Sequence, residues 1–582
     1  MRYFSSETLK CTDLPQFDAL LAQADLFRSD DKLHLRNLCN DTARCAGLTA
    51  EIPGSMLLDY SRQRVNGETM ELLFDLADAV GLTDRREAMR MGQRINATED
   101  KPVLHHVLRR PANYEDRSVH PPPSRAVDDV QEYLQQVTTL REKIRVFSDK
   151  VRSGTYKSVT GVPFRNTLVL GVGGFWVGTK CVVDALEGDQ TAAVQAQGRE
   201  IRFLSNVDPV NFATTVADLD PAETLVILVS RQFLVAETVL NARTVREWMT
   251  QNIDGYDTKT IVARNFVAVT CGNAPRSKSF GVKPENIFTV GEWVNPRYSV
   301  YSAIGLLPLA LHYSYDVIAE FLNGAHDMDE HFFHAPLRDN VPVLLGLIGV
   351  WNSTFLNYEC RAMIPYSHGL RSFPSFVQHI DMESNGKRVG LDGNPLLHRS
   401  GEINFGAPAT DCQHVFFQLL HQGRVLPVDF IGFMESQHPV CLDGEAVANH
   451  DELMSHFFAQ PDALAYGKTL VDLVQEGTPE PLREHMVVTG NRPSSSLLLN
   501  RLDAFSIGQL MALFEHRTAV QGFIWGLNSF DQYGVELGRV LARHVRSQLS
   551  ASRETGASVQ GFNSSTSYLL EQYLAHGKPI PE

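Results

Sequence analysis

Short apolar runs alternate with amphipathic stretches through the middle of the chain. The runs have the length and the β-branched content of buried strands, and the stretches between them, such as residues 237–250, carry apolar side chains at helical spacing. The predicted strands are residues 167–170, 201–204, 224–230, 266–271 and 286–290. Such alternation predicts an α/β fold, with a mostly parallel sheet, right-handed crossovers and helices on both faces.

A second cycle of the same kind begins near residue 340. It opens with a long apolar helix over residues 341–357. Strands are then expected at residues 426–433 and 486–489, and helices at residues 415–420, 503–516 and 534–547. The chain is therefore predicted to hold two α/β domains with segments that cross between them.

Both ends of the chain have helical patterns. Apolar residues three and four apart occur at 55–60, at 70–80 and, after a serine-rich stretch, at 566–575. Pro121, Pro122 and Pro123 form a stiff break that suits a linker. The predicted organisation is a helical N-terminal segment on the larger domain (1–125), two α/β domains (126–315 and 316–548) and a C-terminal helical tail (549–582).

A glycine turn follows the first predicted strand, in the stretch LVLGVGGFWVG at 168–178. Gly171, Gly173 and Gly174 allow a tight turn into a helix over 178–185, which can present backbone N–H groups to an anion. The same turn also serves plain strand-to-helix connections, so both readings stay open. Phe175 stands where a small hydroxyl would suit an anion better.

Charge and cysteine content narrow the function class. The formal net charge of −15 over 582 residues argues against a nucleic-acid partner, which needs a basic face. The eight cysteines are scattered, with no C-x-x-C pair and no zinc spacing, which suits a reducing compartment. The sequence contains no apolar run of about 18 residues, so no membrane association is expected. The N-terminus lacks a secretion-type apolar core, and we expect a cytoplasmic protein.

Two adjacent histidines, His105 and His106, stand out among the titratable residues of the N-terminal segment. Neighbouring residues face different sides of a helix, so we expect one packed and one exposed histidine rather than a metal pair.

Six short motifs together carry a resemblance to a known family. They are TEDKPVLH at 98–105, NPRYSVYSAIG at 295–305, DMESNGK at 381–387, PATDCQH at 408–414, GNRP at 490–493 and FDQYGVELG at 530–538. In sequence, order and spacing they resemble phosphoglucose isomerase, from about residue 50 to 570. The resemblance implies two sugar-isomerase (SIS) domains, usually in a homodimer. It also implies interconversion of glucose 6-phosphate and fructose 6-phosphate without a metal or other cofactor.

The resemblance also implies roles for individual residues. Glu383 matches the base that moves a proton between C1 and C2, and His414 matches the group that opens the sugar ring. Arg297 matches the residue that stabilises the enediolate charge. Glu237 matches a carboxylate that supports the histidine region, and Arg539 stands at the position of the lysine that closes a family signature.

The departures from the family pattern gather where the family holds phosphate. The family's S-K-T-F-T-T reads SRQFLV here, at 230–235, and Phe175 replaces a serine. His379 replaces a glutamine, and Asn295 and Pro296 replace two glycines. The substrate-binding positions implied by the resemblance are Gly174, Phe175, Ser230, Arg231, Gln232, Val235, His379 and Gln532.

Three functions follow from this mixture of matches and departures. We expect a degenerate family member, with weak or no isomerase activity and a structural or regulatory role in a larger protein assembly. The first alternative is an active isomerase with a phosphate site rebuilt around Arg231 and His379. The second is a binder or isomerase of another sugar, with Phe175, Leu234 and Val235 as an apolar wall. A Phe175 ring in the ligand volume would favour the degenerate chain, and a ring turned into the core, with Arg231 facing the cavity, would favour the rebuilt site.

Overall fold

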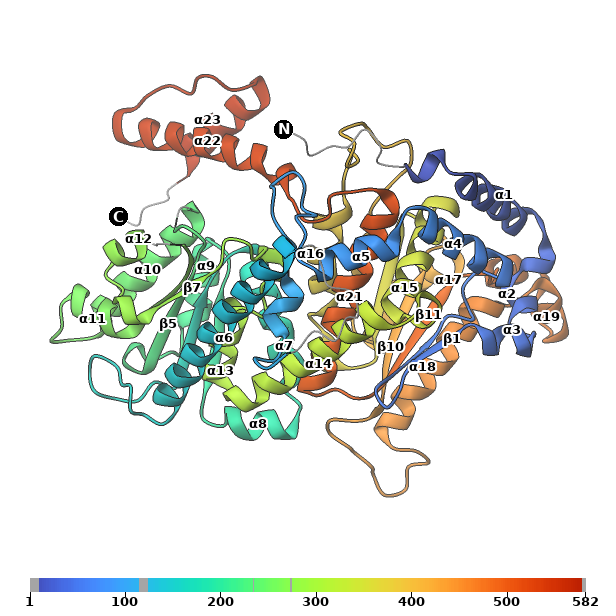
Figure 1. The fold of residues 1–582 in the computed structure, drawn as a ribbon, viewed down its shortest axis with the longest axis horizontal. Helices are drawn as coiled ribbons and strands as arrows, with labels where there is room; N and C mark the ends of the chain where they lie inside the picture. The colour runs from blue at the N-terminus through green and yellow to red at the C-terminus, as the bar shows by residue number, and fades with distance from the viewer. Residues whose placement is uncertain (1–9, 115–123, 234, 273–274, 578–582) are drawn as a thin grey trace. The chain divides into compact units, whose positions relative to one another are not determined.

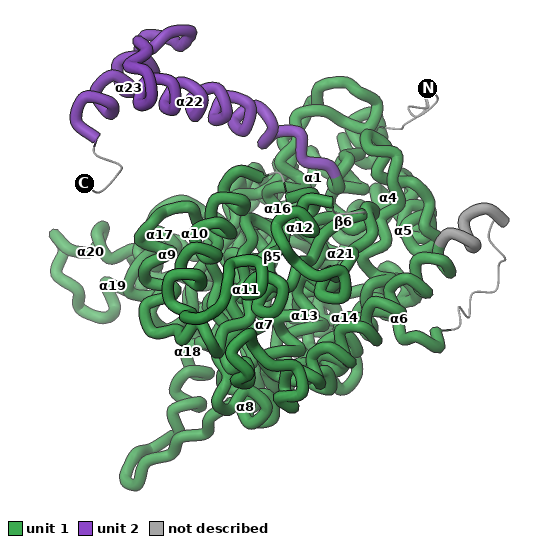
Figure 2. The backbone as a smooth tube through the Cα atoms, turned by 90° about the vertical axis from the view of Figure 1, so that its left-hand side faces the viewer, with its two compact units in different colours: residues 1–530 green, residues 531–582 purple. Residues whose placement is uncertain are grey.

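The computed structural model describes residues 10–114, 124–233, 235–272 and 275–577, with backbone only for 124–129. The chain divides into two compact units, residues 1–530 and residues 531–582, each described by itself below (Figure 2). Pro121, Pro122, Pro123 and Leu234 lie outside the described residues. The domain boundaries expected from the sequence therefore remain a prediction.

The first unit contains an all-parallel five-stranded sheet in the order β4-β3-β5-β6-β7. Its strands are β3 (Asn166–Leu170), β4 (Glu200–Leu204), β5 (Thr224–Val229), β6 (Phe266–Cys271) and β7 (Ile287–Val290). Every residue of β5 and β6 is buried, because both faces of the sheet are covered. All five predicted strands are confirmed, with ends that differ by no more than one residue.

Helices cover both faces of this sheet (Figure 1). They include α6 (Ser124–Arg152), α7 (Val177–Leu186), α8 (Gln190–Ala196), α9 (Pro209–Val216), α10 (Ala236–Asn252), α11 (Thr258–Asn265), α12 (Pro275–Phe280) and α13 (Ala303–His312). Alternate residues of β5 enter different cores: Ile227 packs in the cluster that contains residues of α7 and α13, and Leu228 in the one that contains residues of α10 and α11. This alternation is what a strand buried on both faces requires.

The second sheet has six strands in the order β1-β2-β11-β10-β8-β9. They are β1 (Thr49–Ile52), β2 (Met56–Asp59), β8 (Cys360–Pro365), β9 (Ile403–Gly406), β10 (Val428–Glu435) and β11 (Ser494–Arg501). Four of them, β11, β10, β8 and β9, run parallel. The hairpin β1–β2 comes from the N-terminal segment and pairs antiparallel with β11.

Two predictions for this sheet are wrong. Residues 55–60, expected as a helix, hold strand β2, because pairing with β11 overrides the local spacing. Residues 486–489, expected as a strand, begin at the last residue of α20 (Glu480–Met486) and hold an isolated bridge from Val488 to Lys468; the strand is instead β11. Its opening serines resemble a loop in the sequence, yet Ser495 is buried and its hydroxyl accepts a hydrogen bond from Gln63.

Long helices form the centre of the first unit (Figure 1). They are α14 (Tyr315–His334), α15 (Val341–Val350), α16 (Phe373–Asn385) and α21 (Ala504–Trp525), and nearly every residue of α21 is buried. α14 and α21 touch at glycine: a Cβ on Gly324 would lie 1.9 Å from the Phe505 carbonyl oxygen. The apolar helix expected at 341–357 is confirmed as α15 with a π-helical turn at Trp351–Phe355.

The remaining helices flank these layers. In the N-terminal segment they are α1 (Pro15–Ser29), α2 (Leu35–Leu38), α3 (Thr42–Gly47), α4 (Gly67–Ala79) and α5 (Leu82–Arg90). Beside the second sheet lie α17 (Phe417–Gln422), α18 (Asn449–Tyr466) and α19 (Leu470–Gln475), and the second unit holds α22 (Glu536–Thr555) and α23 (Ser564–His576). No helix in the described part of the chain has both the length and the apolar character to span a bilayer.

The histidine pair corrects another expectation. His105 and His106 lie in a short 3-10 turn (His105–Arg109), and both are buried. The His105 ring stacks on Tyr298 with 4.5 Å between ring centroids, while His106 meets Phe333 edge-on. Because the whole turn is enclosed by other elements, neither ring reaches solvent.

Candidate active site

An arginine and a glutamate from separate elements meet in the first unit. Arg297 lies in a 3-10 turn (Pro296–Tyr298) after β7, and its side chain is completely buried. Glu383 lies in the last turn of α16, and its side chain is 34% exposed. The Arg297 Nη1 atom lies 3.7 Å from Glu383 Oε2, and Nη2 donates to the Ser529 carbonyl at 3.0 Å. A carboxylate that can reach solvent thus has a fixed cation behind it.

The two residues that replace family glycines suit the arginine turn. Asn295 caps the turn, since its side-chain oxygen accepts from the Arg297 N–H at 3.0 Å. Its amide also donates to the Phe530 carbonyl at 2.6 Å. Pro296 stands at the first position of the turn, where a missing N–H costs nothing. This departure from the family pattern therefore leaves the arginine well supported.

The glycine turn closes against the same place. A Cβ on Gly174 would lie 2.6 Å from His379 Cε1 and 2.7 Å from the Pro296 carbonyl oxygen, so only glycine fits there. His379 precedes Glu383 by one helical turn on α16. Burial, and then the Arg297 charge, lower the pKa of His379 to about 4. The imidazole is therefore neutral near pH 7, with one nitrogen to donate and one to accept a hydrogen bond.

Phe175 is turned into the core. Its ring belongs to the main hydrophobic cluster and is 9% exposed. A Cβ added at Gly171 would lie 3.0 Å from Phe175 Cβ and 3.4 Å from Val229 Cβ, so the Gly171 backbone packs closely against both side chains. The expectation that Phe175 forms an apolar wall for a ligand is not supported. The buried ring meets one of the two conditions expected for a rebuilt anion site, and the other, an Arg231 that faces the cavity, stays a prediction.

The turn after β5 carries the largest group of departures. Ser230 is buried, and its hydroxyl accepts from the Phe233 N–H at 3.1 Å. Arg231 is partly exposed, with Nη2 donating to the Glu292 carbonyl at 3.2 Å. Gln232 is exposed, and Val235, partly buried, caps α10.

Four further predicted residues lie outside the two elements that carry Arg297 and Glu383. Glu237 is exposed in the first turn of α10, and His414 is exposed at the end of a 3-10 turn (Asp411–His414). Gln532 and Arg539 belong to the second unit, where Arg539 Nη1 lies 3.3 Å from Glu536 Oε1. The roles of all four remain predictions.

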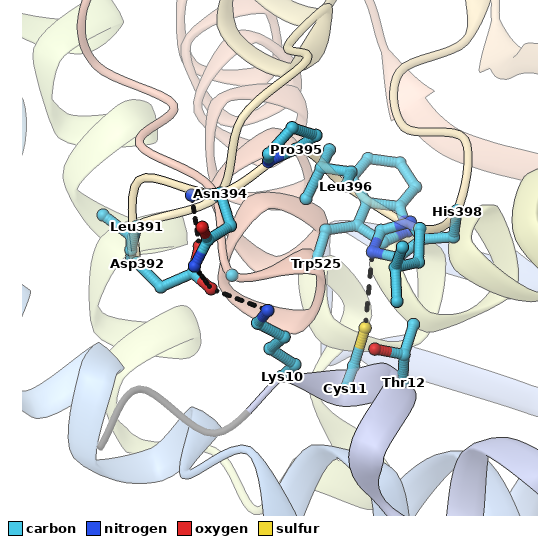
Figure 3. Close-up of a pocket in the computed structure, with 13 residues that line it drawn as sticks. Lys10, Cys11, Thr12, Leu391, Asp392, Asn394, Pro395, Leu396, His398 and Trp525 are labelled. Carbon is cyan, nitrogen blue, oxygen red and sulfur yellow. Dashed lines mark hydrogen bonds and ion pairs between the residues drawn. The ribbon is translucent and has the colours of Figure 1, made fainter. Parts of the chain in front are cut away.

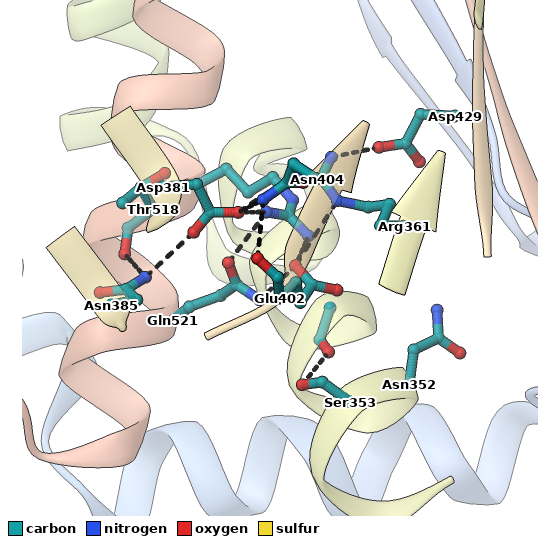
Figure 4. Close-up of polar contacts among 12 residues, drawn as sticks. Asn352, Ser353, Arg361, Asp381, Asn385, Glu402, Asn404, Asp429, Thr518 and Gln521 are labelled. Carbon is teal, nitrogen blue, oxygen red and sulfur yellow. Dashed lines mark hydrogen bonds and ion pairs between the residues drawn. The ribbon is translucent and has the colours of Figure 1, made fainter. Parts of the chain in front are cut away.

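A buried ionic network beneath α16 was missed in the sequence (Figure 4). Asp381, two residues before Glu383, accepts from Arg361 at 3.1 Å and from Arg517 at 3.2 Å. Arg361 also pairs with Asp429 at 2.6 Å, and Arg517 with Glu402 at 2.7 Å. All five side chains are nearly inaccessible to solvent. A sequence pattern that could have indicated this network is a single charged residue within an apolar strand, such as Arg361 in CRAMIP.

The loop after α16 is held by the N-terminal segment (Figure 3). Lys10 Nζ lies 2.9 Å from Asp392 Oδ2, and Cys11 Sγ lies 3.5 Å from His398 Nε2. The cavity between them, also lined by Trp525, has a volume of about 30 Å³. Ligand sites usually enclose about 300–1,000 Å³, so this cavity is too small for a sugar phosphate.

Comparison with known proteins decides the family. The phosphoglucose isomerase family model matches residues 59–570. The chain belongs to the phosphoglucose isomerase family. It is 50% identical, over 550 residues and 94% of each chain, to the cytosolic glucose-6-phosphate isomerase of Oenothera sinuata var. hirsuta. It is 49% identical to cytosolic glucose-6-phosphate isomerase B of Oryza sativa subsp. japonica, over 98% of this chain and 97% of the relative.

A solved structure agrees with this family assignment. The crystal structure of a glucose-6-phosphate isomerase from Chlamydia trachomatis matches with a TM-score of 0.82 at 29% identity, covering 97% of this chain and all of that one. The family resemblance and the α/β fold expected from the sequence are therefore confirmed. The expectation of a degenerate phosphoglucose isomerase finds no support in a 50% identity that spans 94% of the chain.

Proposed function

We propose that this protein is an active glucose-6-phosphate isomerase that interconverts glucose 6-phosphate and fructose 6-phosphate. The observation that carries the proposal is the Arg297–Glu383 pair, with Nη1 and Oε2 3.7 Å apart. The names of the relatives at 49–50% identity support the same substrate. The cytosolic relatives also support a cytosolic location for this chain.

Glu383 moves the proton in this proposal. Its carboxylate takes the proton from C2 of the open aldose and returns it to C1, and the reverse reaction follows the same path. The negative charge that develops on the enediolate oxygen lies near the Arg297 guanidinium. Because that guanidinium is buried and held by the Ser529 carbonyl, it stabilises the charge without first reorganising.

The anion end of the substrate lies, in this proposal, between Arg231, His379 and the glycine turn. Arg231 offers a planar pair of donors to phosphate, which lysine does not. His379 is neutral near pH 7 and can donate one hydrogen bond, and Gly174 lets the backbone approach closely. Ser230 and Gln232 add polar groups on either side of Arg231, in the turn after β5.

We also propose a homodimer, in which a second copy covers the surface around His414. Val415 is 77% exposed beside it, and Leu419 on α17 is exposed as well. Apolar side chains gathered at one surface are typical of an interaction site. Sedimentation equilibrium of the purified protein tests this, and a monomer at micromolar concentration would contradict it.

Turnover of fructose 6-phosphate, coupled to oxidation of the glucose 6-phosphate formed, tests the isomerase. Glu383→Gln should lower kcat by about 10²- to 10⁴-fold, because the amide cannot accept the proton. Glu484→Gln, an exposed site on α20, is the matched control and should leave kcat unchanged. A well-folded wild-type protein without turnover would contradict the proposal.

A further inference from the structure

The residues that follow Arg297 and Glu383 in the chain are bonded to each other. Tyr298 follows Arg297 and Ser384 follows Glu383, and the Tyr298 Oη atom lies 3.0 Å from Ser384 Oγ. Both side chains are fully buried. The hydrogen bond therefore connects the arginine turn directly to the last turn of α16.

We propose that the Tyr298–Ser384 hydrogen bond is a strut that sets the separation of Arg297 and Glu383, with Tyr298 and Ser384 as positioning residues. The inference rests on the isomerase function proposed above. The strut joins the two backbones one residue away from each functional side chain, so a shift of either element moves one group relative to the other.

The tyrosine end of the strut is immobilised by packing. The His105 ring stacks on the Tyr298 ring with an interplanar angle of 16°, and Phe530 lies 5.9 Å from Tyr298 between centroids. Burial, together with the nearby Arg109 charge, keeps the pKa of His105 well below its usual value, so this contact is between neutral rings.

A fully buried ionic cluster lies behind His105. Arg109 Nε donates to Asp329 at 2.7 Å and Nη1 to Glu515 at 2.5 Å. His516 Nε2 lies 2.6 Å from Asp329 Oδ1, and its ring centroid lies 5.9 Å from that of His105. A shift of Tyr298 would displace the His105 ring, which lies beside this cluster, so the strut has a rigid base.

The serine end is where a broken strut would relax. Without the tyrosine hydroxyl, Ser384 Oγ turns to a carbonyl of the preceding helical turn, a bond that tends to bend helices. Glu383 lies in that same last turn of α16. Displacements of about 1 Å cost up to about 100-fold in rate when reacting groups must be aligned. We therefore expect a loss in kcat with little change in KM.

Two variants and their combination test the strut. Tyr298→Phe and Ser384→Ala should each lower kcat roughly tenfold, with KM within about twofold, since substrate contacts are untouched. The double variant should be no slower than either single variant, because both remove the same bond. Multiplicative losses, or an unchanged kcat, would overturn the proposal.

A matched control separates positioning from general stability. Tyr313 is also buried, and its hydroxyl donates to the Val183 carbonyl at 3.1 Å, on elements that do not carry the Arg297–Glu383 pair. Tyr313→Phe should lower the melting temperature about as much as Tyr298→Phe while keeping kcat. An equal loss of kcat in both variants would show that Tyr298 acts through general stability and does not position the Arg297–Glu383 pair.

A binding measurement distinguishes failure of the strut from failure of the isomerase. Absence of wild-type turnover contradicts only the proposed function. The affinity for a hydroxamate of a five-carbon sugar-acid phosphate, whose planar group mimics the enediolate, is measured by calorimetry and needs no turnover. Tyr298→Phe should weaken that binding about tenfold and leave fructose 6-phosphate binding within twofold, and equal affinities for the hydroxamate would overturn the strut.

Discussion

The two ends of the candidate site differ in how their side chains are held. At the proton-transfer end, Arg297 is fully buried, and the helix that carries Glu383 is bonded through Asp381 to two buried arginines. At the anion end, Gln232 is exposed and Arg231 is partly exposed on the turn after β5. Exposed positions tolerate substitution at little cost in stability, whereas buried charged ones do not.

This difference explains where the sequence departs from its family. Most departures fall at the anion end, whereas the buried Arg297 and the partly exposed Glu383 match the family motifs. Loss of a side-chain hydroxyl that binds phosphate, when it lies in an exposed turn, changes the ligand contacts and leaves the fold intact. A motif mismatch there is therefore weak evidence against activity. The comparison can be tested from both ends.

The largest expected effect is the loss of a cation from the network beneath α16. Arg361→Met leaves Asp381, Glu402 and Asp429 with Arg517 as their remaining buried cation, and should lower the free energy of unfolding by about 3–5 kcal/mol. Urea unfolding measures it. Arg145→Met, which breaks an exposed pair on α6, is the control and should change almost nothing. Equal losses of unfolding free energy in the two variants would show that a buried ion pair contributes no more to stability than an exposed one.

A slightly smaller effect is expected at Phe175, a departure whose side chain is buried in the core. Phe175→Ser restores the family residue, yet it removes a ring from the core and should lower the free energy of unfolding by about 3 kcal/mol without tightening fructose 6-phosphate binding. Phe458→Ser, at an exposed site on α18, should be nearly neutral. A stable Phe175→Ser protein with tighter binding would place the ring at the ligand instead.

The pH dependence of stability sharpens the comparison at His379. Its pKa is about 4 in the folded chain and 6.5 when unfolded, so the unfolded state takes up the proton first as pH falls from 6.5 to 4. The free energy of unfolding of the wild type should therefore fall by about 3 kcal/mol more across that window than that of His379→Gln. Above pH 7 the free energies of unfolding of the two proteins should have the same pH dependence. Urea unfolding at several pH values checks this. His438→Gln, an exposed control, should keep the wild-type profile, and parallel curves for His379→Gln would contradict the burial of this ring.

The smallest effect concerns Arg231 at the exposed turn. Arg231→Lys restores the family residue but loses the second donor, and should raise KM for fructose 6-phosphate about tenfold, or about 1.4 kcal/mol. Steady-state kinetics measure it, with Arg243→Lys on α10 as the neutral control. A lower KM in Arg231→Lys would mean that the arginine does not hold the anion.

The sequence predicted the first sheet better than the second for a physical reason. Residues 266–271 form an uninterrupted buried run, and the predicted strand ends where β6 ends. Strand β11 opens with serines, and its neighbour β2 is far away in the sequence, so no local pattern reveals their pairing. Long-range pairing of this kind is decided only when both segments are folded together.

The candidate site shows the same limit. Arg297 and Glu383 were predicted from short motifs, because their roles depend on residue type at fixed positions. The orientation of Phe175 depends on its packing beside Gly171 and Val229, which no motif records. The network around Arg361 joins charges from five separate segments, each unremarkable alone. Contacts between distant segments had to come from the structure.

The hairpin β1–β2 has a consequence for the order of synthesis. Met56, made early, pairs with Leu499, so the sheet gains its last neighbours only when almost the whole chain has left the ribosome. Until then the edge of β2 that pairs with β11 stays unpaired, and chains with an unpaired strand edge are prone to aggregate. Folding of this sheet is therefore completed late in synthesis, and a chaperone that shields residues 49–59 would raise the yield of native protein.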